Sequence, residues 1–150
     1  MAVSDAVEGL DLISGIMDLV KAKMSAALKQ DGEGLVLMEA HVLRIVLASD
    51  GCTQLDVVRE TRRDKAQIGK LIRSLVDRGL LEQSPDLADA RRQRLALTQR
   101  GKAIARKSVE HRAVIARRLF DGMAAADRDD LVRTLGRLQA QLARDADATR

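Results

Sequence analysis

The stretch from Thr53 to Gly101 constrains this chain most, because it predicts two short helices joined by a tight turn and then a charged β-hairpin. Thr53 to Asp56 has the pattern of a capping box, in which a hydroxyl and a carboxylate bond the free amides at a helix start. Thr61 to Arg63 is predicted as the turn, and Asp64 as the cap of the second helix. The inner face of that second helix has clean helical spacing: Ile68, Leu71, Ile72, Leu75 and Val76. A helix-turn-helix followed by a hairpin wing is an arrangement that reads DNA.

Gly79 before the first strand and Pro85 in the turn mark the limits of the predicted hairpin. Gly79 stands where the preceding helix needs a left-handed residue to end. We expect a strand over 80–84, a turn over 85–89 and a returning strand over 91–97, with Leu95 and Leu97 on one face. Thr98 is placed to cap the next helix.

The charge of the chain is concentrated on the same stretch. Residues 59–107 hold fourteen Lys or Arg against six Asp or Glu, a net charge of +8. The whole chain carries only +4, so the remaining residues sum to −4. A surface that binds phosphates requires positive charge gathered in this way.

The rest of the chain predicts long helices and little else. Apolar residues at helical spacing predict helices over 5–30 and 35–49, one from Thr98 to about Ala126, and a last helix capped by Asp127. In that last helix Leu131, Leu135, Leu138 and Leu142 approach heptad spacing. The fold class is therefore mainly α with a small β-hairpin wing. The long terminal helices carry more apolar surface than the middle module covers, which favours an intertwined dimer; packing of the first helix on the last two is the intramolecular alternative.

Residues 37–102 resemble the MarR (multiple antibiotic resistance regulator) family of winged helix-turn-helix transcription factors. Three segments carry the resemblance, namely the opening and close of the second helix (64–68 and 75–81), the wing Pro85–Arg92 with its Asp-x-Arg, and the Leu-Thr-x-x-Gly of 97–101. Ala90 stands where an extra arginine is common. The resemblance implies one domain over 1–150, with a DNA-binding lobe at 35–101 and dimerisation helices at 1–34 and 102–150.

The same resemblance assigns the DNA contacts. It places Arg91 in the minor groove, with Asp89 orienting its guanidinium, and Arg92 beside it; an ordinary hairpin ion pair is the alternative. The exposed side of the second helix is expected to meet the major groove, and the turn to hold phosphates. The expected DNA-binding residues are Arg62, Arg63, Lys65, Ala66, Gln67, Gly69, Lys70, Arg73, Ser74, Asp89, Arg91 and Arg92. Gly69 is included because a residue without a side chain lets the backbone approach DNA.

A small-molecule pocket between the dimerisation helices and the lobe is also implied. Its expected lining is Met17, His41, Arg44 and His111. Cys52 is the single cysteine, so an intrachain disulfide is excluded; a buried structural thiol is favoured over a redox sensor. Two histidines without a further ligand set favour neither a metal site nor a cofactor.

These observations predict a cytoplasmic, sequence-specific DNA-binding regulator that acts as a homodimer on an inverted repeat of double-stranded DNA, as a repressor that responds to a small-molecule effector. An enzyme is not expected, because the chain has no nucleophile-and-base set and no glycine-rich phosphate loop. Two alternatives stay open: a helical protein-protein adaptor without DNA binding, and a redox-sensing regulator that acts through Cys52. No apolar run is long enough to cross a membrane, and no membrane partner is expected.

Overall fold

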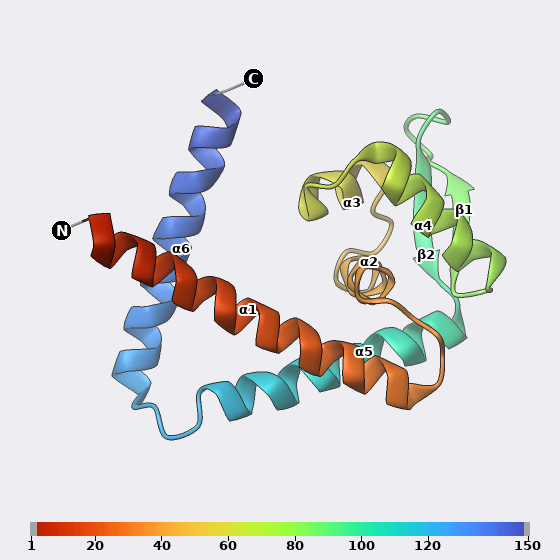
Figure 1. Ribbon diagram of the computed structural model, residues 1–150. Helices are drawn as coiled ribbons and strands as arrows, with labels where there is room; N and C mark the ends of the chain where they lie inside the picture. Colours follow the sequence, from red (N-terminus) through yellow and green to blue (C-terminus); the bar gives the residue numbers. More distant parts are fainter. Residues whose placement is uncertain (1–2, 149–150) are drawn as a thin grey trace. The chain divides into compact units, whose positions relative to one another are not determined.

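The computed structural model describes residues 3–148, which form two compact units divided in the chain after Ile115 (Figure 1). The first unit holds α1 (Val3–Asp31), α2 (Leu37–Ala48), α3 (Gln54–Thr61), α4 (Lys65–Asp77), β1 (Leu81–Pro85) and β2 (Gln93–Leu97). Helix α5 (Gln99–Leu119) begins in the first unit and ends in the second, which also holds α6 (Ala125–Ala148). The predicted fold class, helices with one hairpin wing, is confirmed.

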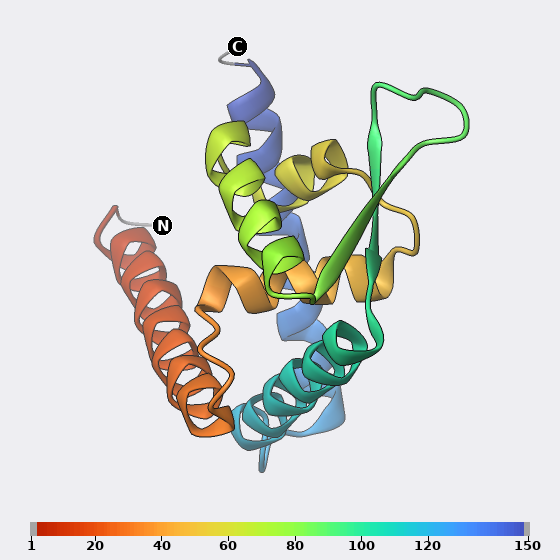
Figure 2. The ribbon, with the colours of Figure 1, turned by 90° about the vertical axis from the view of Figure 1, so that its right-hand side faces the viewer.

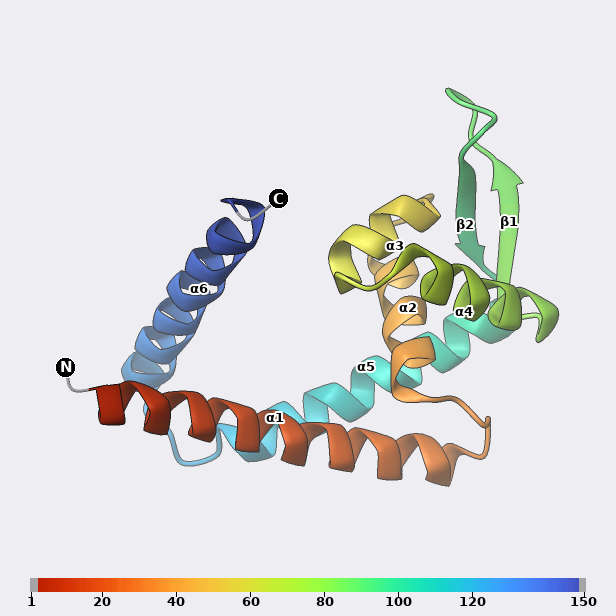
Figure 3. The same ribbon diagram turned by 45° about the horizontal axis from the view of Figure 1, so that its top comes forward.

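The core of the first unit is aliphatic and centres on α2. Ala40, Val42 and Leu43 of α2 are fully buried, together with Ile68 and Leu75 of α4. Figure 3 shows α3 and α4 crossing beside α2, with the hairpin beyond α4. Burying each such side chain contributes roughly 1.5–3 kcal/mol, so the apolar inner face fixes which side of α4 remains outside.

The helix starts are set by the caps that the sequence predicts. The amide of Thr53 donates to Asp56 at 2.8 Å, and the amide of Asp56 donates to the Thr53 hydroxyl at 3.3 Å. These bonds to Thr53 lower the pKa of the Asp56 carboxyl. Asp64 accepts from the amides of Ala66 and Gln67, so α4 begins where the turn ends. Both caps are confirmed.

The hairpin is a two-stranded antiparallel sheet in which Leu81 pairs with Leu97 and Pro85 with Gln93. Leu95 and Leu97 are buried on one face, as the alternation predicts. The amide of Leu95 also donates to the Cys52 carbonyl at 2.8 Å, which ties the hairpin to the segment before α3. Figure 2 shows the two strands running out to a loop that projects from the unit.

The prediction for the last two helices is wrong at their junction. Helix α5 ends at Leu119 and not near Ala126, and α6 begins at Ala125, so Asp127 lies in its first turn and does not cap it. Gly122 has a φ of +77°, a left-handed conformation that glycine adopts at little cost. The break therefore follows the glycine rather than the later acid.

Gly101 allows a close backbone approach between α5 and the residue before β1. A Cβ at this position would lie 2.0 Å from the carbonyl oxygen of Leu80 and 3.3 Å from Cδ2 of Leu97. Thr98 stabilises the junction between the hairpin and α5, because its hydroxyl donates to the Gly79 carbonyl and accepts from the Gly101 amide. The threonine and the glycine together join the hairpin to α5.

We therefore expect Gly101→Ala to lower the free energy of unfolding by about 2 kcal/mol or more, because the clash is with backbone that cannot move aside. Gly136→Ala is the matched control. Gly136 lies inside α6 with nothing within 4 Å of its Cβ position, so alanine should raise stability by roughly 0.5–1 kcal/mol. Urea unfolding followed by circular dichroism measures both, and equal effects of the two substitutions would contradict this account.

Candidate nucleic-acid interface

The outer face of α4 is exposed and basic. Lys65, Ala66, Gln67, Lys70 and Arg73 are all exposed, opposite the buried apolar side of the same helix. None of the three cations makes an ion pair among the described residues, so their charges face solvent. Such a face can place amide and cationic groups against base edges and phosphates.

The turn before α4 adds two more exposed cations. Arg62 and Arg63 follow the end of α3, and Arg62 has a φ of +53°. It is the one non-glycine residue with positive φ in the described chain, and its left-handed backbone closes the turn between the two helices. These two residues directly precede the cap of α4, so their cations add to the positive charge at the start of that helix.

Two residues of the predicted surface lie elsewhere, which corrects the sequence-based roles. Gly69 is buried, and its Cβ position lies 3.2 Å from the side-chain amide nitrogen of Gln54. The missing side chain thus lets α3 approach α4, and it does not bring the backbone toward DNA. Ser74 is half-buried and its hydroxyl donates to Glu39 at 3.2 Å, so it faces α2.

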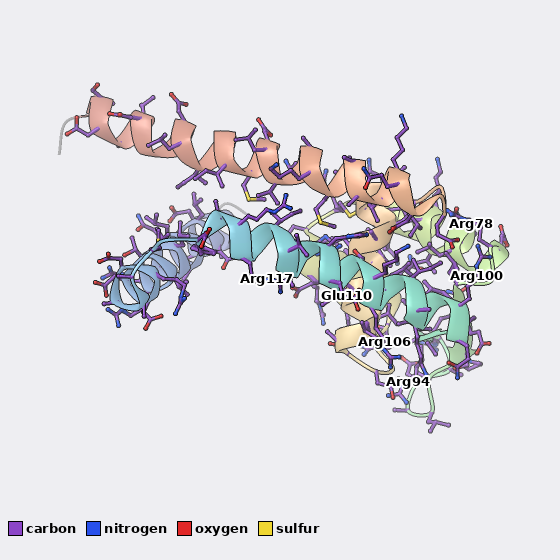
Figure 4. All side chains as sticks on the ribbon, turned by 90° about the horizontal axis from the view of Figure 1, so that it is seen from below. Arg78, Arg94, Arg100, Arg106, Glu110 and Arg117 are labelled. Carbon is purple, nitrogen blue, oxygen red and sulfur yellow. The ribbon has the colours of Figure 1, made fainter. Side chains whose placement is uncertain are left out.

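Glu39 is a structural residue near the site that the sequence interpretation missed. Its carboxylate is buried and accepts from the amide of Val36 at 3.2 Å, the hydroxyl of Ser74 and the guanidinium of Arg78 at 3.0 Å. Arg78 also donates to the carbonyl of Glu33. Figure 4 shows Arg78 next to Arg100, whose guanidinium pairs with the Glu33 carboxylate at 2.7 Å. These bonds join the end of α4 to the start of α2.

The wing carries its own exposed cations. Arg91 and Arg92 are exposed in the loop between β1 and β2. Asp89 accepts from the backbone amide of Arg91 at 3.0 Å and lies 3.8 Å from Nε of Arg92. The structure therefore gives Asp89 contacts that shape the wing turn, and not the predicted bond to the guanidinium of Arg91.

A hollow of about 640 Å³ lies beside α2. It is bordered by α2, the α2–α3 turn, α3 and α5. The lining residues are His41, Arg44, Ile45, Ala48, Ser49, Asp50, Gly51, Cys52, Asp56, Glu60 and Arg112. We call it the α2–α5 hollow.

Two arginines, Arg44 and Arg112, border the α2–α5 hollow together with the acidic residues Asp50, Asp56 and Glu60. Burial and the neighbouring Arg112 lower the pKa of Arg44 to about 10. Burial, then Arg44 and Arg112, also lower the pKa of His41. The guanidinium of Arg44 donates to the hydroxyl of Ser108 at 2.8 Å, but neither arginine has a carboxylate within ion-pair distance among the described residues. An anion between them would relieve this repulsion.

The expected pocket is thus only partly assembled. His41 and Arg44 border the hollow, whereas Met17 is exposed on α1 and His111 bonds the Asp31 carboxylate at 2.8 Å. Lys107 binds the other oxygen of Asp31 at 2.8 Å. His111 therefore ties α5 to the end of α1, a partner that spacing along the chain cannot reveal.

Cys52 borders the hollow but is buried, and burial together with Asp56 and Asp50 raises the pKa of its thiol. A protonated thiol is a poor nucleophile, which disfavours the redox alternative. Among the described residues no group of three or more His, Cys, Asp or Glu side chains could hold a metal ion. No helix in residues 3–148 is long and apolar enough to cross a membrane.

Comparison with known proteins agrees with this geometry. Residues 33–92, from the segment before α2 to the wing, match the sequence model of the MarR family. This part of the chain is therefore similar in sequence to the MarR family. The resemblance seen in the sequence is confirmed. A comparison with curated protein sequences found no significant match.

Solved structures extend the likeness beyond the lobe. BpsR of Bordetella bronchiseptica, whose DNA binding is regulated by 6-hydroxynicotinic acid, is 26% identical, with a TM-score of 0.73 over 86% of this chain and 91% of that one. FabT of Streptococcus pneumoniae in complex with DNA is 18% identical, with a TM-score of 0.82 over 92% and 97%. S. aureus MepR in complex with DNA is 22% identical, with a TM-score of 0.77 over 87% and 95%. The latter two show the shared fold.

The Glu39 contacts generate a stability prediction. Arg78→Ala removes the cationic partner of a buried carboxylate, so we expect it to lower the free energy of unfolding by roughly 1–3 kcal/mol. Arg73→Ala, on the exposed face of the same helix, should stay within about 0.5 kcal/mol. Chemical denaturation measures the difference. A matching small effect for both would mean that the buried carboxylate does not depend on Arg78.

Proposed function

We propose that the chain binds double-stranded DNA as a homodimer and represses transcription from an inverted-repeat operator. The observation that carries the proposal is the exposed basic face of α4, flanked by the cationic turn and the cationic wing on one lobe of MarR type. FabT and MepR, which share the fold, have been solved in complex with DNA. A protein adaptor without DNA binding gives no reason for this concentration of positive charge.

The proposed DNA-binding residues fall into two groups: residues that recognise bases, which we call readers, and residues that hold phosphates, which we call clamps. Gln67 on the outer face of α4 has the groups to pair with adenine in the major groove, while Lys70 and Arg73 suit guanine or phosphate. Arg62, Arg63 and Lys65 stand at the start of α4 and hold phosphates, which positions the module without reading sequence. Arg91 and Arg92 of the wing contact the minor groove next to the major groove that α4 occupies.

The homodimer is supported by apolar side chains that each unit leaves exposed. On α1 these are Val7, Leu10, Ile13, Ile16, Met17 and Leu19. On α6 they are Leu131, Val132, Leu135, Leu138 and Leu142. A monomer rarely exposes apolar stripes of this length, and a second copy of the chain supplies matching ones. Two copies are also what an inverted repeat requires.

The α2–α5 hollow is the effector site that we assign to this regulator. Its facing cations, Arg44 and Arg112, favour a small organic anion, with the apolar side of Ile45 beside them. BpsR, which is regulated by an organic acid, provides a parallel in the same fold. Binding that differs between two states of the dimer by about 1.4 kcal/mol changes DNA affinity tenfold.

The proposal is tested by measuring binding to duplex DNA selected from random sequence, across a range of salt concentrations. We expect an inverted repeat with half-site centres about 10 bp apart and a steep loss of affinity with salt. Sedimentation should show a dimer, and Leu135→Glu should produce monomer or aggregate, whereas Arg133→Glu on the polar side of α6 should leave the dimer intact. A folded monomer with salt-independent binding would exclude the function.

Readers and clamps should respond differently to substitution. Gln67→Ala should relax preference at one base position, at a cost of roughly 1–3 kcal/mol if it makes a bidentate pair. Lys65→Ala should weaken every sequence about equally and flatten the salt dependence. Competition binding with single-base variants of the selected site measures both. If the two substitutions cause the same sequence-blind loss, Gln67 is not a reader.

For Asp89 in the wing, we expect a change in DNA affinity opposite to the change that net charge alone predicts. Asp89→Ala removes a negative charge near DNA, so charge alone predicts tighter binding. We expect weaker binding instead, because Asp89 holds the amide of Arg91 and lies beside Arg92. Folding should change by no more than about 0.5 kcal/mol, since the wing is exposed. Tighter binding by a folded Asp89→Ala dimer would leave only a general basic surface.

A further inference from the structure

Arg94 of β2 connects the base of the wing to the α2–α3 turn. Its Nε donates to the carbonyl of Gly51 at 3.2 Å and lies 3.3 Å from a carboxylate oxygen of Asp86. Asp86 directly follows the last residue of β1, and its side chain is only 18% exposed. One guanidinium thus reaches both the wing and the turn, which Figure 4 places around the labelled Arg94 at the hairpin end of the lobe.

The fit between Arg94 and Gly51 is close. A Cβ on Gly51 would lie 2.8 Å from Nη2 and 2.9 Å from Cζ of Arg94, so the guanidinium occupies the space that any other residue's side chain would need. Gly51 also has a φ of +72°, which a side chain would strain. The turn is therefore built to receive Arg94.

Backbone bonds flank this contact on both sides. The amide of Leu95 donates to the Cys52 carbonyl at 2.8 Å, and the amide of Asp86 donates to the Arg92 carbonyl at 2.9 Å. Beyond Asp86 the loop reaches Arg91 and Arg92, and the bonds described there are local to it. The angle at which the loop leaves the lobe is set at its base.

We propose that Arg94 is a positioning residue for DNA binding, which fixes the wing by holding Asp86 and the Gly51 carbonyl and does not itself contact DNA. The inference rests on the proposed function and adds a residue to it. A wing that is already fixed in position loses less conformational freedom when it binds DNA. The affinity for DNA therefore depends on the contacts of Arg94 with Asp86 and the Gly51 carbonyl. The guanidinium is already engaged by a carboxylate and a carbonyl, which favours this role over a phosphate contact.

The test uses two variants and two matched controls in the full chain. Arg94→Gln and Asp86→Asn break the contact from opposite sides and change the charge in opposite directions. Arg106→Gln removes the same charge from an exposed position on α5, and Glu82→Gln removes the same charge from exposed β1. Neither control side chain makes a hydrogen bond or ion pair among the described residues.

We expect Arg94→Gln and Asp86→Asn each to weaken DNA binding about fivefold or more, with the double variant no worse than Arg94→Gln alone. Glu82→Gln should leave affinity unchanged or tighten it. The salt dependence should stay the same in Arg94→Gln, since a lost phosphate contact would flatten the slope by about one unit per subunit. A flattened slope, or tighter binding by Asp86→Asn, overturns the proposal.

Amide hydrogen exchange separates this inference from the proposed function, because it needs no DNA. Exchange at the wing amides of Asp86, Arg92 and Leu95 should accelerate in both variants and in neither control, while α2 stays protected. Unchanged exchange at these amides overturns the proposal even where DNA binding falls. If the wild-type chain binds no DNA, the proposed function fails, and the exchange result still shows whether Arg94 holds the wing.

Discussion

The orientation of α4 depends on one buried carboxylate, that of Glu39. Apolar contacts between α2 and α4 are strong but have no direction, so they allow one helix to slide or turn on the other. The bonds from Val36, Ser74 and Arg78 to Glu39 have direction, and they satisfy a charge that is costly to bury alone. The outer face of α4 therefore stands at a defined angle to the lobe, and Gln67 and Lys70 stand with it.

Local features of the fold were predictable from the sequence because their causes are local. The caps at Thr53 and Asp64 depend on bonds within three residues, and Gly79 takes the left-handed conformation that ends α4. The junction of α5 and α6 was not predictable in the same way. The sequence pattern predicts the break at Asp127, and only the backbone of the folded chain shows that it lies at Gly122.

The same distinction between local and distant causes applies to the residues of the candidate site. Exposure of Gln67, Lys70 and Arg73 followed from the helical period, since the opposite side of α4 is apolar. The positions of Gly69 and Ser74 depend on Gln54 and Glu39, partners that lie far away in sequence. A signal for Glu39 did exist: it is a carboxylate in a helix that is otherwise largely apolar, where a charge needs a partner.

The carbonyl of Cys52 connects the α2–α5 hollow to the hairpin. Cys52 borders the α2–α5 hollow, and its carbonyl holds the amide of Leu95 in β2. Strand residues rise by about 3.3 Å each, so the loop residues of the wing lie on the order of 10 Å beyond this pivot. A tilt of about 10° at Cys52 would then move an arginine of the wing by about 2 Å, which is enough to break a hydrogen bond to DNA. The backbone of Cys52 is thus a direct connection between the lining of the hollow and the strand that leads to the wing.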